Sequence, residues 1–425
     1  MTGYIEKKYT FRSWVIEQLF MGKTIKEYLK GLITPFNLVA ALILLVGVPV
    51  SVYRFSQGLG PSTNLSDNNP WGLWIGFDVM AGVALAAGGF VMGTAVYLFG
   101  LKEYHPTVRP AVLTGFLGYF FVVVGLCFDL GRPWRLPYPM LVSIGVTSVL
   151  LLVGWHVALY LTTQFVEFCP ALFEWLGLKN FRKWAVRLTV GATIFGAILS
   201  TLHQSALGAL FLLTPGKLHP LWYSSFLPVF FLISAIIAGI SMVIFESMLS
   251  HRVFGDRINH QGVDFDKLTL GLGKAAAIGL FAYFALKWVG VAHDNRWEFL
   301  NTPLGHWFLV EVFIFVLLPC LLFTWAVRKS NAALVRFASI VTVIGIIINR
   351  INVAVVGLNW NIEDRYFPSW MEFIVTITII TTGLLTFRWI VNRMPILNEH
   401  PDYSETDQHV LERERVTAEQ FLNSP

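Results

Sequence analysis

Charged residues are scarce in this chain. Only 13% of its 425 residues are Asp, Glu, Lys or Arg, whereas a soluble domain carries about 25%. Hydrophobic residues make up 55%, so the chain has too little polar surface to fold in water, and a large soluble helical protein is disfavoured. The 35 Phe and 15 Trp are typical of lipid-facing helices and membrane interfaces. The composition predicts an all-α integral membrane protein.

Cysteine is equally scarce, which bears on metal chemistry. The three cysteines, Cys127, Cys169 and Cys320, lie far apart and form no CxxC pattern. Such isolated residues cannot supply the ligand set of a zinc site or an iron-sulfur cluster. We therefore expect no metal in this chain, and we expect any cluster to sit on a partner protein.

Histidines that could hold haem between facing helices are few. Four of them lie in or near apolar stretches: His156, His203, His293 and His306. His156 lies in the middle of a stretch and the other three lie near one side, so they cannot form a stack of two haems across the membrane. No haem is expected, although one haem remains an open alternative at this stage.

The apolar stretches predict the organisation of the chain. Residues 1–35 are amphipathic and Lys-rich without a cleavage site, which favours a segment on the cytoplasmic membrane surface, and residues 396–425 form a cytoplasmic acidic tail. Between them, residues 36–395 contain about ten stretches long enough to cross 30 Å of hydrocarbon. The ten predicted spans are 36–55, 71–100, 110–129, 142–166, 187–212, 222–248, 270–293, 304–328, 332–357 and 367–392.

The distribution of Lys and Arg predicts the orientation. On the side of the N-terminus the loops and tails hold 23 of these residues, the other side holds 6, and Lys287 and Arg350 lie inside spans. Cytoplasmic loops retain positive charge. Both termini are therefore predicted to be cytoplasmic in a bacterial inner membrane, which makes the loop DLGRPWRLPYP periplasmic.

Ionisable groups inside the spans are the main functional candidates, because burying each one costs about 2.5 to 3.5 kcal/mol on insertion scales. Most of them share one depth near the periplasmic side, and only Glu246 lies toward the cytoplasmic end. A helix-packing role explains any one of these groups, but a set at one depth favours a site. The members at the periplasmic depth are Asp78, Asp129, His203, Lys287, Glu311, Arg350 and Glu372.

Two predicted helix faces could form a quinone site. Trp71, Trp74 and Asp78 are spaced i, i+3, i+7 and so are expected on one face, where a flat ring could rest. His203, with Gln204 beside it, adds polar groups at the same depth. Quinone reduction takes up two electrons and two protons, so it needs side chains that donate protons and are refilled.

Several motifs together resemble the polysulfide reductase NrfD family. The resemblance covers roughly residues 35–395 and is closest to the ten-span branch that includes the membrane subunits of hydrogenase-2 and of the quinone reductase complex of sulfate reducers. The segments that carry it are WGLWIGFD (71–78), FDLGRPWRLPY (128–138), LHQSALGAL (202–210), HPLW (219–222), IFE (244–246) and FPSWMEF (367–373).

The resemblance implies a quinone-binding subunit without haem or metal. It implies two four-helix bundles, at about 71–212 and 222–357, with one flanking helix at each end. It also implies a periplasmic ferredoxin-like iron-sulfur partner and a further periplasmic catalytic subunit, such as a multihaem cytochrome, a molybdopterin-type subunit or a nickel-iron hydrogenase. The positions that match polar groups of the family are Asp78, Asp129, Arg132, His203, Gln204, Ser205, Glu246, Glu311, Arg350 and Glu372.

The leading hypothesis is a menaquinone-reducing subunit that is active only within its complex, with lipid around it and no nucleic-acid partner. Asp78 and His203 are expected to face one another and to contact the ring or relay protons, while Asp129 and Arg132 shape the pocket mouth. Trp71, Trp74, Gln204 and Ser205 complete the predicted quinone contacts. Quinol oxidation, proton conduction through Glu246, Lys287, Glu311, Arg350 and Glu372, and a passive anchor are the alternatives.

Overall fold

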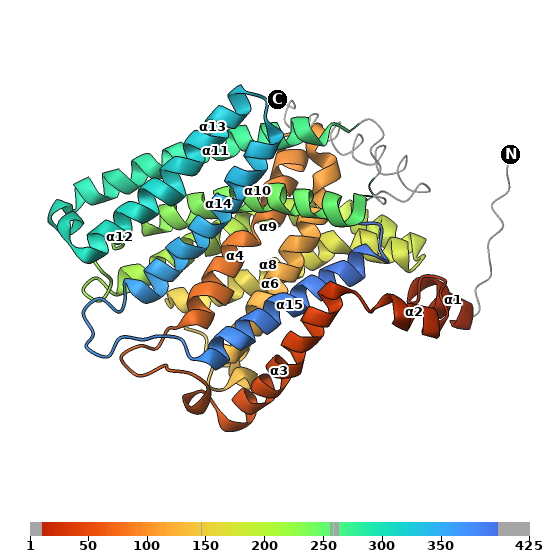
Figure 1. Cartoon of the computed structure of the whole chain (residues 1–425), viewed down its shortest axis with the longest axis horizontal. Coiled ribbons are helices and arrows are strands. Elements are labelled where there is room, and N and C mark those ends of the chain that lie inside the picture. The colour runs from red at the N-terminus through yellow and green to blue at the C-terminus, as the bar shows by residue number, and fades with distance from the viewer. Residues whose placement is uncertain (1–10, 146, 256–257, 259–262, 398–425) are drawn as a thin grey trace.

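Ten helices in the structure are long and apolar enough to cross a membrane. The computed structural model describes residues 11–145, 147–255, 258 and 263–397, and among these there is no β-strand. The prediction of an all-α membrane protein with about ten spans is confirmed (Figure 1). The spans are Pro35–Gln57, Trp74–Leu98, Lys102–Asp129, Val149–Trp175, Lys179–Leu213, Leu227–Phe254, Phe265–His293, Pro303–Arg328, Ala332–Val356 and Trp370–Val391.

Because the number of described spans is even, the first span begins and the last span ends at the same end of the helix array. We call this the termini end, and the other the opposite end. The orientation of these ends in a membrane stays a prediction, with the termini end cytoplasmic. The predicted acidic tail lies outside the described residues from position 398 onward.

The helices pack in two closed rings of four spans. In the first ring, α5 (Gly88–Gly93) contacts α6 (His105–Asp129), α6 contacts α8 (Val149–Trp175), α8 contacts α9 (Lys179–Leu210), and α9 returns to α5. These are the contacts that the predicted first bundle requires, although the division into bundles itself stays a prediction.

The second ring follows the same pattern. Here α10 (Leu227–Phe254) contacts α11 (Phe265–His293) and α14 (Ala332–Ile351), and α13 (Leu318–Arg328) contacts both α11 and α14. The eighth span begins with α12 (Pro303–Val312), which precedes α13.

The two rings meet along the second span. There α10 packs on α4 (Gly82–Leu85) and α5, and also on α9. A Cβ added at Gly239 of α10 would lie 2.9 Å from the backbone nitrogen of Gly88. Only small residues permit this approach, as the glycine cluster of the second span predicts.

Two outer helices pack against the first ring. Figure 1 shows α3 (Pro35–Gln57) and α15 (Trp370–Val391) side by side at one edge of the array, and α15 also contacts α6. The first and last spans are therefore neighbours in space although they stand at opposite ends of the sequence.

Several spans contain π-helical stretches, which are rare and often occur at functional sites. They are η2 (Trp74–Ala81), η3 (Thr94–Leu98), η9 (Phe313–Leu317) and η10 (Asn352–Val356). Stretches η2 and η10 contact each other between the two rings. The local rotation of a π-turn changes which side chains share a face, and this affects the predicted site.

The described part of the N-terminal segment forms two short helices, α1 (Phe11–Gln18) and α2 (Ile25–Gly31), beyond the termini end of α3 (Figure 1). The helix α2 begins with a capping box between Thr24 and Glu27 and buries none of its residues. Arg393 ties it to the last span by donating to the Tyr28 hydroxyl at 2.8 Å. Exposed Ile25 and Lys30 on this helix suit the predicted position on the membrane surface.

Candidate functional site

His203 is the centre of a buried hydrogen-bond network inside the first ring. Its side chain on α9 is fully buried, Nδ1 lies 2.7 Å from the Leu199 carbonyl oxygen, and Nε2 lies 2.5 Å from the Tyr119 hydroxyl. A carbonyl oxygen only accepts hydrogen bonds, so Nδ1 carries the proton. Nε2 of the neutral ring then accepts a hydrogen bond from the Tyr119 hydroxyl. This arrangement is suited to proton exchange.

The network continues through groups that the sequence did not single out. The Tyr160 ring on α8 lies 4.6 Å from that of Tyr119 and 5.3 Å from the His203 ring. Gln164 donates to the Tyr160 hydroxyl at 2.8 Å. Gln204 donates to the Tyr119 hydroxyl at 3.3 Å. Side chains of three helices, α6, α8 and α9, therefore pack as a polar cluster around His203.

One signal in the sequence could have found these residues. His156, Tyr160, Gln164 and Glu167 follow one another along the fourth span at spacings of four, four and three, so they share one helix face. A polar stripe on an apolar span is costly and marks the side that faces other protein. Tyr119 alone gave no such signal, because a single Tyr in a span is common.

Asp78 is bonded to the last span, outside the first ring. It belongs to η2, its Oδ2 accepts a hydrogen bond from the Thr376 hydroxyl on α15 at 2.7 Å, and it is 6% exposed. A Cβ added at Gly125 of α6 would lie 2.8 Å from the Asp78 Cβ, so a larger residue there would displace the carboxyl group. Asp78 therefore sits between η2, α6 and α15.

Asp78 and His203 have hydrogen-bond partners on different helices, and the expectation that they face each other stays a prediction. Asp78 is bonded to α15, whereas His203 is bonded to α6 and packs on α8. The two groups lie at a similar depth in the array. Gln204, next to His203, donates to the Val83 carbonyl at 3.0 Å, and Val83 follows Asp78 by five residues, which is roughly 8 Å along a helix.

The predicted shared face of Trp71, Trp74 and Asp78 is wrong. Trp71 precedes the helix, which begins at Leu73 and is π-helical from Trp74. The Trp71 ring packs on Phe211 at 5.5 Å, whereas the Trp74 ring packs near Phe128 at 5.9 Å. An α-helical spacing does not apply to a segment that is partly irregular and partly π-helical, so the two indoles point to different neighbours.

Asp129 has Arg54 of the first span as its basic neighbour. Its Oδ1 is buried without a hydrogen-bond partner, and it lies close enough to Arg54 of α3 for electrostatic attraction. Arg54 is 1% exposed and donates to the Phe128 and Leu130 carbonyls at 2.7 and 2.6 Å. Arg132 is exposed, and the expectation that Asp129 and Arg132 shape the mouth of a pocket stays a prediction.

A second buried cluster surrounds Glu311 in the second ring. Lys287 Nζ lies 3.4 Å from Glu311 Oε1, and both side chains are almost fully buried. Asn349 donates to Oε1 at 2.7 Å, while Trp222 and Asn352 donate to Oε2 at 2.8 and 2.6 Å. The carboxylate is thus fully hydrogen-bonded and its charge is held in place.

Arg350 completes this cluster without a carboxylate of its own. It donates to the Asn349 side chain at 3.0 Å and to the Ser234 hydroxyl at 2.8 Å, and its guanidinium lies 3.8 Å from the Phe231 ring centre. The structure therefore brings together three of the predicted proton-path residues, Lys287, Glu311 and Arg350, from three helices.

The other two predicted proton-path residues lie elsewhere. Glu246 is buried on α10, and its Oε1 has no hydrogen-bond partner among the described residues. Glu372 forms the capping box of α15 with Ser369 and also accepts hydrogen bonds from the Asn64 backbone and the Tyr366 hydroxyl. These contacts give Glu372 a structural task, which is to fix the loops of the opposite end.

The arrangement of His, Cys, Asp and Glu side chains bears on metal and haem binding. Among the described residues, no group of three or more His, Cys, Asp or Glu is arranged to hold a metal ion. Haem iron would need a free histidine nitrogen as axial ligand. His203 does not fit that role, because Tyr119 and Leu199 engage both of its ring nitrogens.

Comparison with known proteins identifies the family. The family described as "Polysulphide reductase, NrfD" matches residues 61–360. The chain belongs to the NrfD family. This membership confirms the resemblance drawn from the motifs.

Three relatives cover most of the chain. A protein of Nitratidesulfovibrio vulgaris strain Hildenborough is 52% identical over 88% of this chain and 98% of its own length. The probable Ni/Fe-hydrogenase 2 b-type cytochrome subunit of Escherichia coli strain K12 is 31% identical over 84% of this chain and 90% of its own length. The menaquinone reductase integral membrane subunit of N. vulgaris Hildenborough is 26% identical over 83% of this chain and 89% of its own length. The NrfD chain is thus a multi-pass membrane subunit of an oxidoreductase complex.

Proposed function

We propose that this subunit passes electrons from a periplasmic iron-sulfur partner to menaquinone at the opposite end of the first ring. Two observations support the quinone: the relative named as a menaquinone reductase subunit, and the proton-exchanging network of His203 and Tyr119. Reduction of a quinone consumes two protons, and such a network can supply them where water is excluded.

The different burial of the two key groups divides their roles, and this observation carries the proposal. Asp78 keeps 6% of its surface exposed, whereas His203 keeps none. A group that touches a substrate needs exposed surface, so Asp78 would contact the quinone ring. His203 would act behind it as proton supplier, and Thr376 would orient the Asp78 carboxyl group.

The loop between the third and fourth spans suits the docking of the electron-carrying partner. It lies at the opposite end, beside Asp129, and carries Arg132 and Arg135 on its surface. Trp134 is 71% exposed and Leu141 is 72% exposed. Exposed aromatic, Arg and aliphatic side chains of this kind are enriched at the centres of protein interfaces.

Steady-state kinetics of the purified complete complex test the proposal. Asp78→Asn should lower kcat by roughly 100-fold, the scale of general acid-base catalysis, and should also raise the KM for a menaquinone analogue. His203→Leu should lower kcat with little change in KM, because His203 does not touch the ring. Asp294→Asn, at the same end but in the second ring, is the matched control and should behave like the wild type.

Two further measurements separate a functional effect from a failure to assemble. The partner's redox centres should still be reducible in both variants, and the subunits should still copurify. If intact complexes of both variants reduced the analogue at the wild-type rate, the site assignment would be wrong. The pocket would then be sought near Lys287, Glu311 and Arg350. If the complex only oxidised quinol, the direction would be reversed at the same site.

Proton translocation through the second ring is a second candidate function. The buried cluster of Lys287, Glu311 and Arg350 favours it, because ionisable groups inside spans often mark proton paths. When the complex in sealed vesicles reduces quinone, the number of protons that enter or leave the vesicle interior should then exceed the number consumed by the quinone. A passive anchor would show neither quinone turnover nor proton movement.

A further inference from the structure

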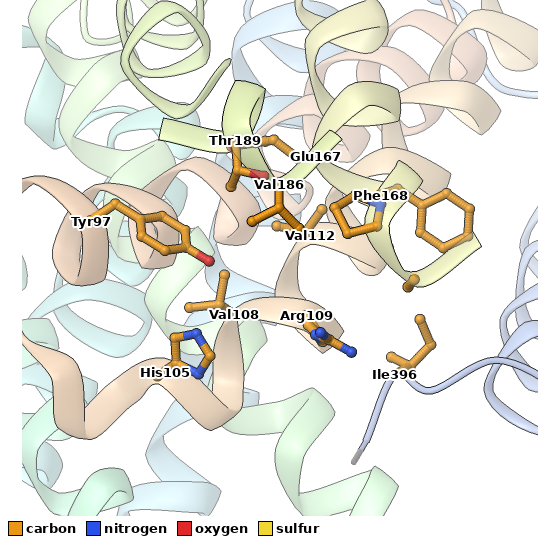
Figure 2. Close-up of a pocket in the computed structure, with 12 residues that line it drawn as sticks. Tyr97, His105, Val108, Arg109, Val112, Glu167, Phe168, Val186, Thr189 and Ile396 are labelled. Carbon is orange, nitrogen blue, oxygen red and sulfur yellow. The ribbon is translucent and has the colours of Figure 1, made fainter. Parts of the chain in front are cut away.

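A cavity of about 60 Å³ lies between the second, third, fourth and fifth spans at the termini end (Figure 2). It is partly open to the surface, and its wall combines apolar side chains with Tyr97, His105, Arg109 and Glu167. A polar cavity of this size has room for several water molecules. Neither the predicted quinone site nor the second cluster uses it.

Glu167 of α8 is the acidic side chain in the wall of this cavity. It is half-buried on α8, and the Thr193 hydroxyl donates to its Oε1 at 2.6 Å. The nearby cation is already occupied, since Arg109 donates to both Glu174 oxygens at 3.1 and 3.0 Å. Glu167 therefore lines a cavity large enough for water. Among the described residues, the salt bridge of Arg109 is formed with Glu174 and not with Glu167.

The same face of α8 leads from Glu167 to the His203 network. Gln164 precedes Glu167 by three residues, and its amide donates to the Tyr160 hydroxyl at 2.8 Å. Its other atom, Oε1, is fully buried without a partner. An unpartnered buried acceptor is where a water molecule completes a network. The polar groups thus extend from the cavity to the rings that surround His203.

Glycines of the second and third spans make room for this row of side chains. A Cβ added at Gly89 would lie 3.0 Å from the Gln164 amide nitrogen, and one at Gly115 would lie 2.5 Å from it. A Cβ at Gly93 would lie 3.1 Å from a Thr193 methyl group. The small residues therefore serve the polar row as well as close helix packing.

We propose that this cavity is a water-filled proton inlet and that Glu167 takes up protons from the termini end for delivery to His203. The inference rests on the proposed quinone function. In that reaction one quinone takes two electrons from the partner's one-electron centres and two protons from water at the termini end, which gives one quinol. Electrons and protons then enter from opposite ends, so turnover separates charge across the membrane.

The segment after the last span forms part of the inlet wall. Ile396 lines the cavity and is 2% exposed, and Arg109 donates to the Pro395 carbonyl at 3.0 Å. This segment therefore positions Arg109 at the cavity wall.

Complete complex in sealed vesicles of one orientation tests the inlet, with a pH-sensitive dye trapped inside. With wild-type complex, quinone reduction should remove protons from the compartment that faces the termini end. Glu167→Gln keeps the acceptor for Thr193 but cannot carry a proton, so it should lower both the reduction rate and proton uptake by roughly 100-fold. Glu167→Asp should recover most of the loss. Glu103→Gln, an exposed carboxyl group at the same end, should leave both unchanged.

The possible results separate this inference from the function on which it rests. If wild-type complex does not reduce quinone at all, the proposed function fails. If it reduces quinone with protons taken from the opposite end, the inlet is overturned while the function stands. Normal turnover and uptake in an assembled Glu167→Gln complex would also overturn it. If that variant did not assemble, the side of proton uptake by the wild type would decide alone.

Discussion

Replacing Glu311 with Gln should destabilise the folded protein strongly. The carboxylate is 1% exposed and is the acidic partner of Lys287, which is 6% exposed. Gln keeps the size and one acceptor oxygen but removes the negative charge. Lys287 would then remain buried as an unpaired cation. Arg350 nearby would not compensate, because it is itself a cation whose hydrogen bonds go to Asn349, the Phe231 carbonyl and Ser234.

The expected loss follows from measured buried ion pairs. Removing one partner of such a pair costs about 3 to 5 kcal/mol, because the other charge is left uncompensated in a medium of low dielectric. An exposed pair offers the matched control. Arg336 and Asp266 lie 2.5 Å apart with side chains 29% and 65% exposed, so Asp266→Asn should cost about 1 kcal/mol or less.

Unfolding in mixed detergent micelles with increasing denaturing detergent measures these differences. The free energy of unfolding should fall far more for Glu311→Gln than for Asp266→Asn. The double variant Lys287→Met with Glu311→Gln should regain much of the loss, because neither charge then remains. If Glu311→Gln cost no more than the surface control, the argument from buried charge would be refuted, and Lys287 would have to be neutral in the native protein.

Four other outcomes are expected. Burial lowers the pKa of His219, in a loop at the opposite end, to about 4. Because the unfolded chain binds this proton more readily, the free energy of unfolding should fall as the pH drops from 6.5 to 4 and should stay level above pH 6.5. Thermal unfolding of His219→Gln should show much less of this pH dependence. Tyr119→Phe removes the donor to His203 and should cost about 1 to 3 kcal/mol of stability as well as most of the quinone turnover, which unfolding and kinetics of one preparation can measure. Reporter fusions after residue 395 should be active only as cytoplasmic reporters and those within 130–140 only as periplasmic ones; the reverse pattern would refute the orientation. Purified chain should show no Soret band in its visible spectrum, and a band of stoichiometric intensity would show that haem is bound after all.

Hydropathy predicted the number of spans, because it sums over about 20 residues and tolerates single exceptions. The predicted span boundaries were wrong where a charged residue is buried inside a span by ion pairs with neighbouring helices. The fourth span was expected at 142–166 and is Val149–Trp175. Its last turns contain Glu174, which looks like a loop residue in the sequence but forms ion pairs with Arg109 and Arg182. Such compensation depends on neighbouring helices and leaves no local signal.

The same limit applies to the site. Asp78 and His203 could be singled out because each is expensive to bury. Their partners could not, because helix rotation decides which neighbour a side chain meets, and the π-turns of η2 change that rotation. Arg54 was overlooked because it stands at the end of the first span, where a basic residue usually points into solvent. In the structure it is buried against the carbonyls of Phe128 and Leu130.

The outer helices α3 and α15 change how the site should be understood. The resemblance treated them as additions at the two ends of a pair of bundles. In the structure α15 supplies Thr376 to Asp78, and α3 supplies Arg54 beside Asp129. Both acidic groups at the opposite end therefore depend on helices outside the first ring. Because α3 and α15 also pack on each other, a shift of either helix would move the orienting partners of both carboxyl groups together, and the proposed contact with the substrate would respond to the outer pair as a unit.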